Sequence, residues 1–63
     1  MNTDLIGARV SFVALDLRTV EEARFLGVVR GACVAADLAM LIVQVDTGQL
    51  TLVRVERATV VTP

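Results

Sequence analysis

Apolar and polar residues alternate along much of the chain with the period of two that is typical of β-strands. Near the start, the alternation places Val10, Phe12 and Ala14 on one face. Twelve valines support a β-rich fold, because β-branched side chains pack well on a pleated surface. We expect five strands, over residues 8–15, 27–34, 38–46, 49–55 and 59–62.

Glycines and turn residues punctuate these strands. Residues 46–49 predict a tight turn between the third and fourth strands, where Gly48 can adopt a positive φ at no steric cost. A second turn is expected over residues 56–58. Gly27 and Gly31 are expected to mark bends, bulges or places where another backbone approaches closely.

The segment between the first two strands, residues 16–24, is interpreted as a long loop. The alternative is a single helical turn, because Thr19 followed three residues later by Glu22 fits the capping-box pattern. Both interpretations leave the second strand beginning near Gly27.

A length of 63 residues allows one small domain, spanning residues 1–63. Hydrophobic residues make up 56% of the chain, which excludes intrinsic disorder. A domain of this size buries only about 60% of its unfolded surface. Cys33 is the single cysteine, so no intramolecular disulfide can form, and we expect it to be buried and unreactive. Self-association is the remaining common aid to stability.

Three stretches punctuate the chain as in SH3-like barrels: residues 7–10 (Gly-Ala-Arg-Val), residues 27–31 (Gly-Val-Val-Arg-Gly) and residues 45–48 (Val-Asp-Thr-Gly). The layout is particularly similar to the family of plasmid-encoded type II dihydrofolate reductases. The resemblance implies an all-β, five-stranded SH3-like small barrel. It does not carry the activity: residues 50–53 read Leu-Thr-Leu-Val where that family has its Gln-Ile-Tyr group, and the chain has no lysine or tyrosine.

The absence of His, Lys, Tyr and Trp removes most catalytic and base-stacking chemistry. We therefore expect no enzyme activity, no cofactor and no metal site. A net charge of −1 lacks the positive field that dominates nucleic-acid affinity. One alternative remains open, a nucleic-acid-binding barrel whose oligomer gathers Arg9, Arg30 and Arg54 around an anionic ligand. A second alternative is an enzyme with its site at an oligomer pore.

Several strands are apolar on both faces, although a small barrel buries only one face of each strand. Exposed apolar patches usually mark interaction surfaces. We therefore expect a non-catalytic, self-associating binding or assembly module whose partner is a second copy or another protein; alternatively, residues 16–24 fold back over the second face. The candidate subunit interface consists of Val13, Leu15, Met40, Ile42, Val53 and Val55.

The sequence also bears on location. The longest apolar run, residues 38–43, has six residues, whereas a membrane-spanning helix needs about 20. The first residues, Met-Asn-Thr-Asp, lack the basic start of a signal peptide. We expect a cytoplasmic protein without membrane contact.

Overall fold

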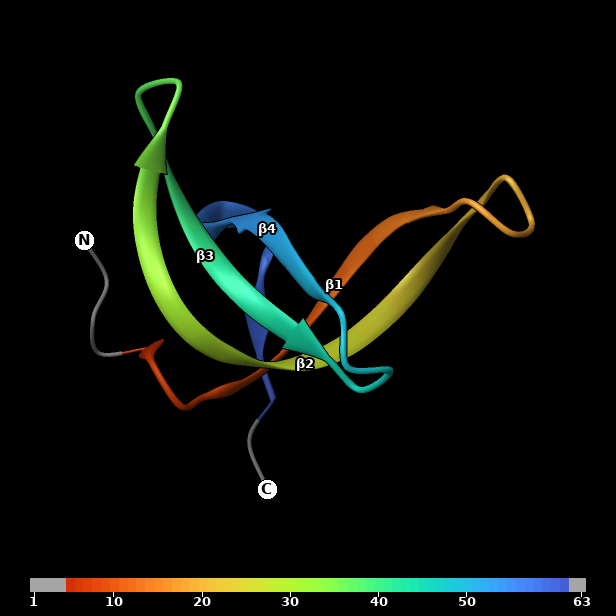
Figure 1. Cartoon of the computed structure of the whole chain (residues 1–63), viewed down its shortest axis with the longest axis horizontal. Helices are drawn as coiled ribbons and strands as arrows, with labels where there is room; N and C mark the ends of the chain where they lie inside the picture. The colour runs from red at the N-terminus through yellow and green to blue at the C-terminus, as the bar shows by residue number, and fades with distance from the viewer. Residues whose placement is uncertain (1–4, 62–63) are drawn as a thin grey trace.

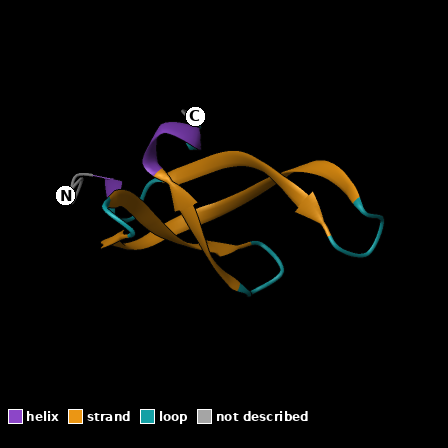
Figure 2. Ribbon diagram, turned by 90° about the horizontal axis from the view of Figure 1, so that it is seen from above, coloured by secondary structure: helices purple, strands orange, loops and turns teal. Residues whose placement is uncertain are grey.

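A computed structural model describes residues 5–61 of the chain. Five antiparallel strands form one sheet in the order β4-β3-β2-β1-β5, which confirms the all-β prediction (Figures 1 and 2). A short 3-10 helix, η2 (Val55–Arg57), joins β4 to β5. The strands are β1 (Arg9–Asp16), β2 (Glu21–Ala35), β3 (Leu38–Val45), β4 (Leu50–Arg54) and β5 (Thr59–Val60).

The sheet is open. Across residues 5–61, β4 pairs only with β3 and β5 pairs only with β1, so these two strands form the edges. The closed barrel expected from the sequence is therefore not confirmed. Residue 62, the expected end of the last strand, lies outside the described residues.

The second strand begins six residues earlier than predicted, at Glu21 instead of Gly27. Both interpretations of residues 16–24, the loop and the helical turn, are wrong. Only residues 17–20 form a turn, and the ladder with β1 starts directly after it at the pair Asp16↔Glu21. The alternation of Ala23 and Phe25 with charged neighbours belongs to a strand, because antiparallel pairing with β1 satisfies its backbone groups.

This pairing creates a two-stranded hairpin, residues 13–24, which we call the arm; the remaining described residues form the body. The arm projects away from the body at one end of the long, bent strand β2 (Figure 1). Three residues beyond the arm, β2 lies close to the backbone of β3 at Gly27, where a Cβ would be 2.6 Å from the Gln44 carbonyl oxygen. A bulge between Val29 and Gly31 adds one further residue to β2.

The core lies on the inner face of the body. Phe12 stacks on Phe25 at the base of the arm, with ring centroids 5.7 Å apart. Burial of each such apolar side chain contributes about 1.5–3 kcal/mol. The buried apolar residues are Val10, Phe12, Val29, Leu41, Val43, Val45 and Val53.

Each of the three hairpin turns contains a residue at positive φ, including Val20 in the turn of the arm. Gly48 has a φ of 100°, as predicted. The β2–β3 turn consists of Ala36 and Asp37, with φ values of 51° and 63°. Positive φ at both central residues is the geometry of a type I′ turn. Alanine does not favour this region, so the sequence contains no strong signal for this turn geometry.

Candidate interaction surface

The outer face of the body, opposite the core, is largely apolar. In the ladder, Ile42 pairs with Leu52, and each lies between inward-facing neighbours. Met40, two residues before Ile42 in β3, pairs with Cys33. Leu50 and Leu52 are 65% and 53% exposed, whereas Met40 and Ile42 are half-buried. We call Met40, Ile42, Leu50 and Leu52 the outer patch.

The structure divides the predicted interface residues among three places. Met40 and Ile42 lie on the outer face as expected from alternation. Val13 and Leu15 are also exposed, at 43% and 52%, but they lie on the arm and not on the outer face of the body. The remaining two residues, Val53 on β4 and Val55 after it, do not lie on the outer face.

Val53 is only 6% exposed and belongs to the core, which corrects its placement on the second face. Val55 lies in η2 and packs against the core. The prediction misplaces both residues because the loop before β4 is longer than predicted. The predicted strands, ending at residue 46 and restarting at residue 49, imply a two-residue loop. In the structure the Val45 N–H donates to the Gln49 carbonyl, so three residues lie in the loop.

A change of one residue in register moves every side chain of a strand to the opposite face. With the three-residue loop, Leu41 pairs with Val53, and both side chains point inward. Leu50 and Leu52 point outward and replace Val53 and Val55 in the candidate surface. Gly48 in this loop is the available signal, because glycine at positive φ commonly ends a three-residue hairpin loop.

The three arginines proposed as contacts for an anionic ligand each contact a different group of the same chain. Arg9 Nη2 lies 2.8 Å from Asp46 Oδ2, and Arg54 forms an ion pair with Glu56. Arg30 Nε donates to Gln44 Oε1 at 3.0 Å. Two of the three charges are thus neutralised locally by a carboxylate.

Gln44 belongs to the outer face, because its neighbours Val43 and Val45 are buried. The hydrogen bond to Gln44 therefore holds the Arg30 guanidinium over the outer face, beside Leu50, which pairs with Gln44. Within residues 5–61 no carboxylate forms an ion pair with Arg30. Its positive charge borders the outer patch without a counter-charge.

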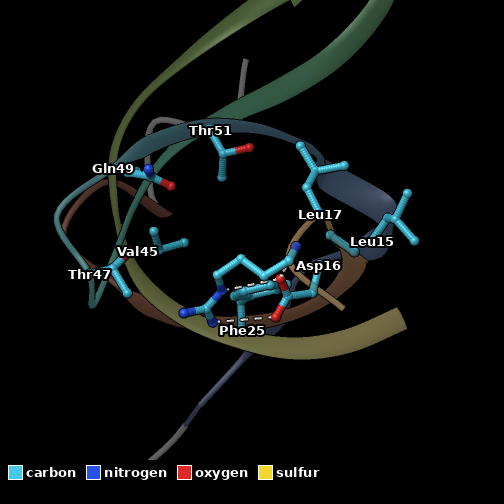
Figure 3. Close-up of a pocket in the computed structure, with 10 residues that line it drawn as sticks. Leu15, Asp16, Leu17, Phe25, Val45, Thr47, Gln49 and Thr51 are labelled. Atoms are coloured by element: carbon cyan, nitrogen blue, oxygen red, sulfur yellow. Dashed lines mark hydrogen bonds and ion pairs between the residues drawn. The ribbon is translucent and has the colours of Figure 1, made fainter. Parts of the chain in front are cut away.

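The tip of the arm is held by a network around Asp16. Asp16 Oδ1 accepts hydrogen bonds from the Arg18 backbone N–H at 2.9 Å and from Arg18 Nε at 3.4 Å (Figure 3). The Arg18 side-chain hydrogen bond, followed by the backbone one, lowers the pKa of Asp16. The Val20 N–H donates to the Asp16 carbonyl at 2.7 Å, which closes the turn.

This closed turn exposes apolar side chains. Leu17 and Val20 are 82% and 74% exposed. Val20 also has a φ of 58°, a region that β-branched residues rarely adopt. Backbone strain of this kind is concentrated at functional sites.

A groove of about 500 Å³ lies between the arm and the β3–β4 hairpin (Figure 3). Phe25 and Val45 contribute apolar surface, and Asp16 and Arg18 line it from the arm. The side facing the arm is polar, with Thr47, Gln49 and Thr51 from the β3–β4 hairpin. Asp16 is the one carboxylate among the described residues of this lining, and Arg18 donates hydrogen bonds to it.

Cys33 is half-buried on the outer face instead of fully buried, which corrects the expectation from its apolar neighbours. Across residues 5–61 no three His, Cys, Asp or Glu side chains come close enough to hold a metal ion. In the same part of the chain, no helix has the length and apolar character needed to cross a bilayer.

Comparison of the chain with protein-family models, with curated proteins and with solved structures found no match. Its function must therefore be inferred from the surfaces described above.

Proposed function

We propose that the chain is a non-catalytic assembly module that associates with further copies of itself through the outer patch. The observation that carries the proposal is the row of exposed and half-buried apolar side chains over β3 and β4, with Leu50 and Leu52 the most exposed. Monomeric proteins rarely expose contiguous apolar surface of this kind. We also propose that the five-stranded sheet is an SH3-like small barrel, supported by the sequential antiparallel pairing and the return of β5 to β1.

A second copy is the proposed occupant for two reasons. Among the described residues, seven apolar side chains are buried in the core, so burying the outer patch would add substantially to stability. Two complementary charges also form no ion pair within residues 5–61: Arg30 borders the outer patch, and Glu22 lies on the arm. Charge complementarity of this type favours a specific partner over non-specific collapse.

The local pairing of Arg9 with Asp46 and of Arg54 with Glu56 weighs against the nucleic-acid alternative. A phosphate-binding surface needs several cations directed outward. Only Arg30 among the three candidates lacks a carboxylate partner within the described residues.

The test is the molar mass of the wild-type chain by light scattering after size exclusion, over a range of concentrations. We expect an oligomer, and Leu52→Glu should dissociate it, because a carboxylate buried without a partner costs several kcal/mol. Thr59→Glu is the matched control, since it adds the same charge at an exposed position on the opposite edge of the sheet. A wild-type chain that stays monomeric at millimolar concentration would exclude self-association.

A further inference from the structure

We propose that the arm of one copy docks on the outer patch of the next, with Glu22 of the arm facing Arg30 beside the patch. This inference rests on the proposed self-association and specifies its contact. The arm contributes exposed apolar residues at and near its tip, Leu15, Leu17 and Val20. The outer patch contributes a matching apolar surface over β3 and β4.

The charges of the two regions are opposite in sign. The arm carries Asp16, Glu21 and Glu22 against Arg18 and Arg24. Within residues 5–61 neither Glu21 nor Glu22 forms an ion pair. The outer face of the body presents Arg30, whose guanidinium donates to the neutral Gln44 and forms no ion pair with any described residue.

Within the described residues, Glu22 and Arg30 do not pair with each other. Arg30 follows Glu22 by eight residues along β2, which corresponds to about 26 Å of strand. The bend of β2 directs the arm away from the body (Figure 1). Two side chains cannot bridge that length, so an ion pair between Glu22 and Arg30 requires a second copy of the chain.

The tip of the arm contains an unfavourable feature that a partner would offset. Val20 has a positive φ of 58°, which strains the backbone of a β-branched residue. Its side chain is 74% exposed in the described part of the chain. Docking of the tip against an apolar surface would bury this side chain and offset the cost of the strained backbone.

The contact joins two different surfaces, so it is heterologous. Such contacts close into a pair or ring when the rotation permits, and otherwise form open chains. Light scattering distinguishes these assemblies, and each of them contains the same contact between Glu22 and Arg30.

Charge exchange tests this contact in the full chain. Glu22→Arg and Arg30→Glu each place like charges together and should weaken association about tenfold or more, measured as the dissociation constant by sedimentation equilibrium. The double variant restores an opposite pair and should return to within about threefold of the wild type. Both positions are exposed, so circular dichroism should show an unchanged fold.

Two variants provide matched controls for the charge change. Glu21→Arg makes the same substitution one residue away, on the opposite side of the arm strand. Arg57→Glu reverses an exposed arginine in η2. Both should retain association within about threefold of the wild type.

The outcomes separate the inference from the proposed function. A double variant as weak as the single variants would overturn the pairing of Glu22 with Arg30. Association that survives all four charge reversals but is lost in Leu52→Glu would overturn arm docking and leave self-association through the outer patch intact. A monomeric wild-type chain would overturn both.

Discussion

The arm and the body share one strand, β2, but differ in what holds them. In the body, β2 pairs with β3 and presents Val29 to a core built from several strands. In the arm, residues 21–24 of the same strand pair only with β1. The backbone geometry is continuous, yet one half buries side chains on its inner face and the other leaves most of them exposed.

Backbone pairing and side-chain burial are therefore separable along a single strand. A two-stranded hairpin alone is only marginally stable in water, so the arm depends on its base, where Phe12 stacks on Phe25. Its tip is closed by Asp16 and Arg18. The body supplies the free energy of folding, and the arm is an extension available for contacts with other molecules.

Removal of a leucine side chain from each region should give the largest contrast. Leu41→Ala leaves a cavity at a fully buried position and should lower the free energy of unfolding by about 2–5 kcal/mol. Leu17→Ala, at an 82% exposed position, should change it by less than about 0.5 kcal/mol. Urea denaturation below the association concentration measures both. A comparable loss in Leu17→Ala would mean that the arm is packed within the monomer.

The junction between arm and body provides the second contrast. Gly27→Ala would place a Cβ 2.6 Å from both the Gln44 carbonyl oxygen and Val43 Cγ1, so the β2–β3 ladder must shift. We expect a loss of about 1–3 kcal/mol, typical of overpacking. Thermal melts with calorimetry measure the change.

Gly31→Ala is the matched control for this junction. Its nearest contact, Ile42 Cδ1, would be 3.4 Å away, an ordinary van der Waals distance. The substitution also reduces the entropy of the unfolded chain, so stability should be unchanged or rise by up to about 1 kcal/mol. If both alanines behaved alike, close approach of the backbone at Gly27 would not explain the junction.

The body was more predictable from the sequence than the arm. Alternation of apolar residues located β1, β3 and β4 to within about one residue, because burial on one face dictates the pattern. The arm half of β2 buries few side chains, so its exposed charged residues interrupt the apolar alternation that identifies a half-buried strand. The capping-box match at Thr19 and Glu22 then suggested a helical turn that the ladder with β1 excludes.

The candidate surface was predictable only in part, because it depends on register. Met40 and Ile42 followed from the alternation of β3, which the buried residues on either side fix. Leu50 and Leu52 could be placed on this face only if the length of the loop before β4 were known, because one residue more or less in that loop exchanges the two faces of the strand. The proposed pairing of Glu22 with Arg30 of another copy could not be predicted without knowing that β2 bends and separates the two residues (Figure 1).

Backbone strain at the turns gives a smaller contrast with opposite signs. Gly48→Val forces a β-branched residue to a φ of 100° and should cost about 1–2 kcal/mol. Val20→Gly removes such a residue from a φ of 58° in the arm and should raise stability by up to about 1 kcal/mol. Thermal melts below the association concentration report both. Loss of stability in Val20→Gly would show that the Val20 side chain makes stabilising contacts in the monomer.

The smallest expected effect is a pH-dependent loosening confined to the arm. The hydrogen bonds from Arg18 hold the pKa of Asp16 below its ordinary value of 3.8. A carboxyl whose pKa is lowered by folding contributes stability above its unfolded pKa and loses that contribution as the pH falls through the folded pKa. The tip should therefore stay closed at neutral pH and loosen only below about pH 3.8.

An NMR titration that follows the Arg18 amide, whose N–H donates to Asp16 Oδ1, measures this transition. We expect a midpoint below 3.8 in the wild type. In Arg18→Leu, the loss of the side-chain hydrogen bonds should move the midpoint upward toward the ordinary value, while the backbone bond retains part of the effect. Amides in the core strands should show little response over the same range. A wild-type midpoint at or above 3.8 would mean that Arg18 does not hold Asp16 in solution, and that the closed tip is not an independent feature of the arm.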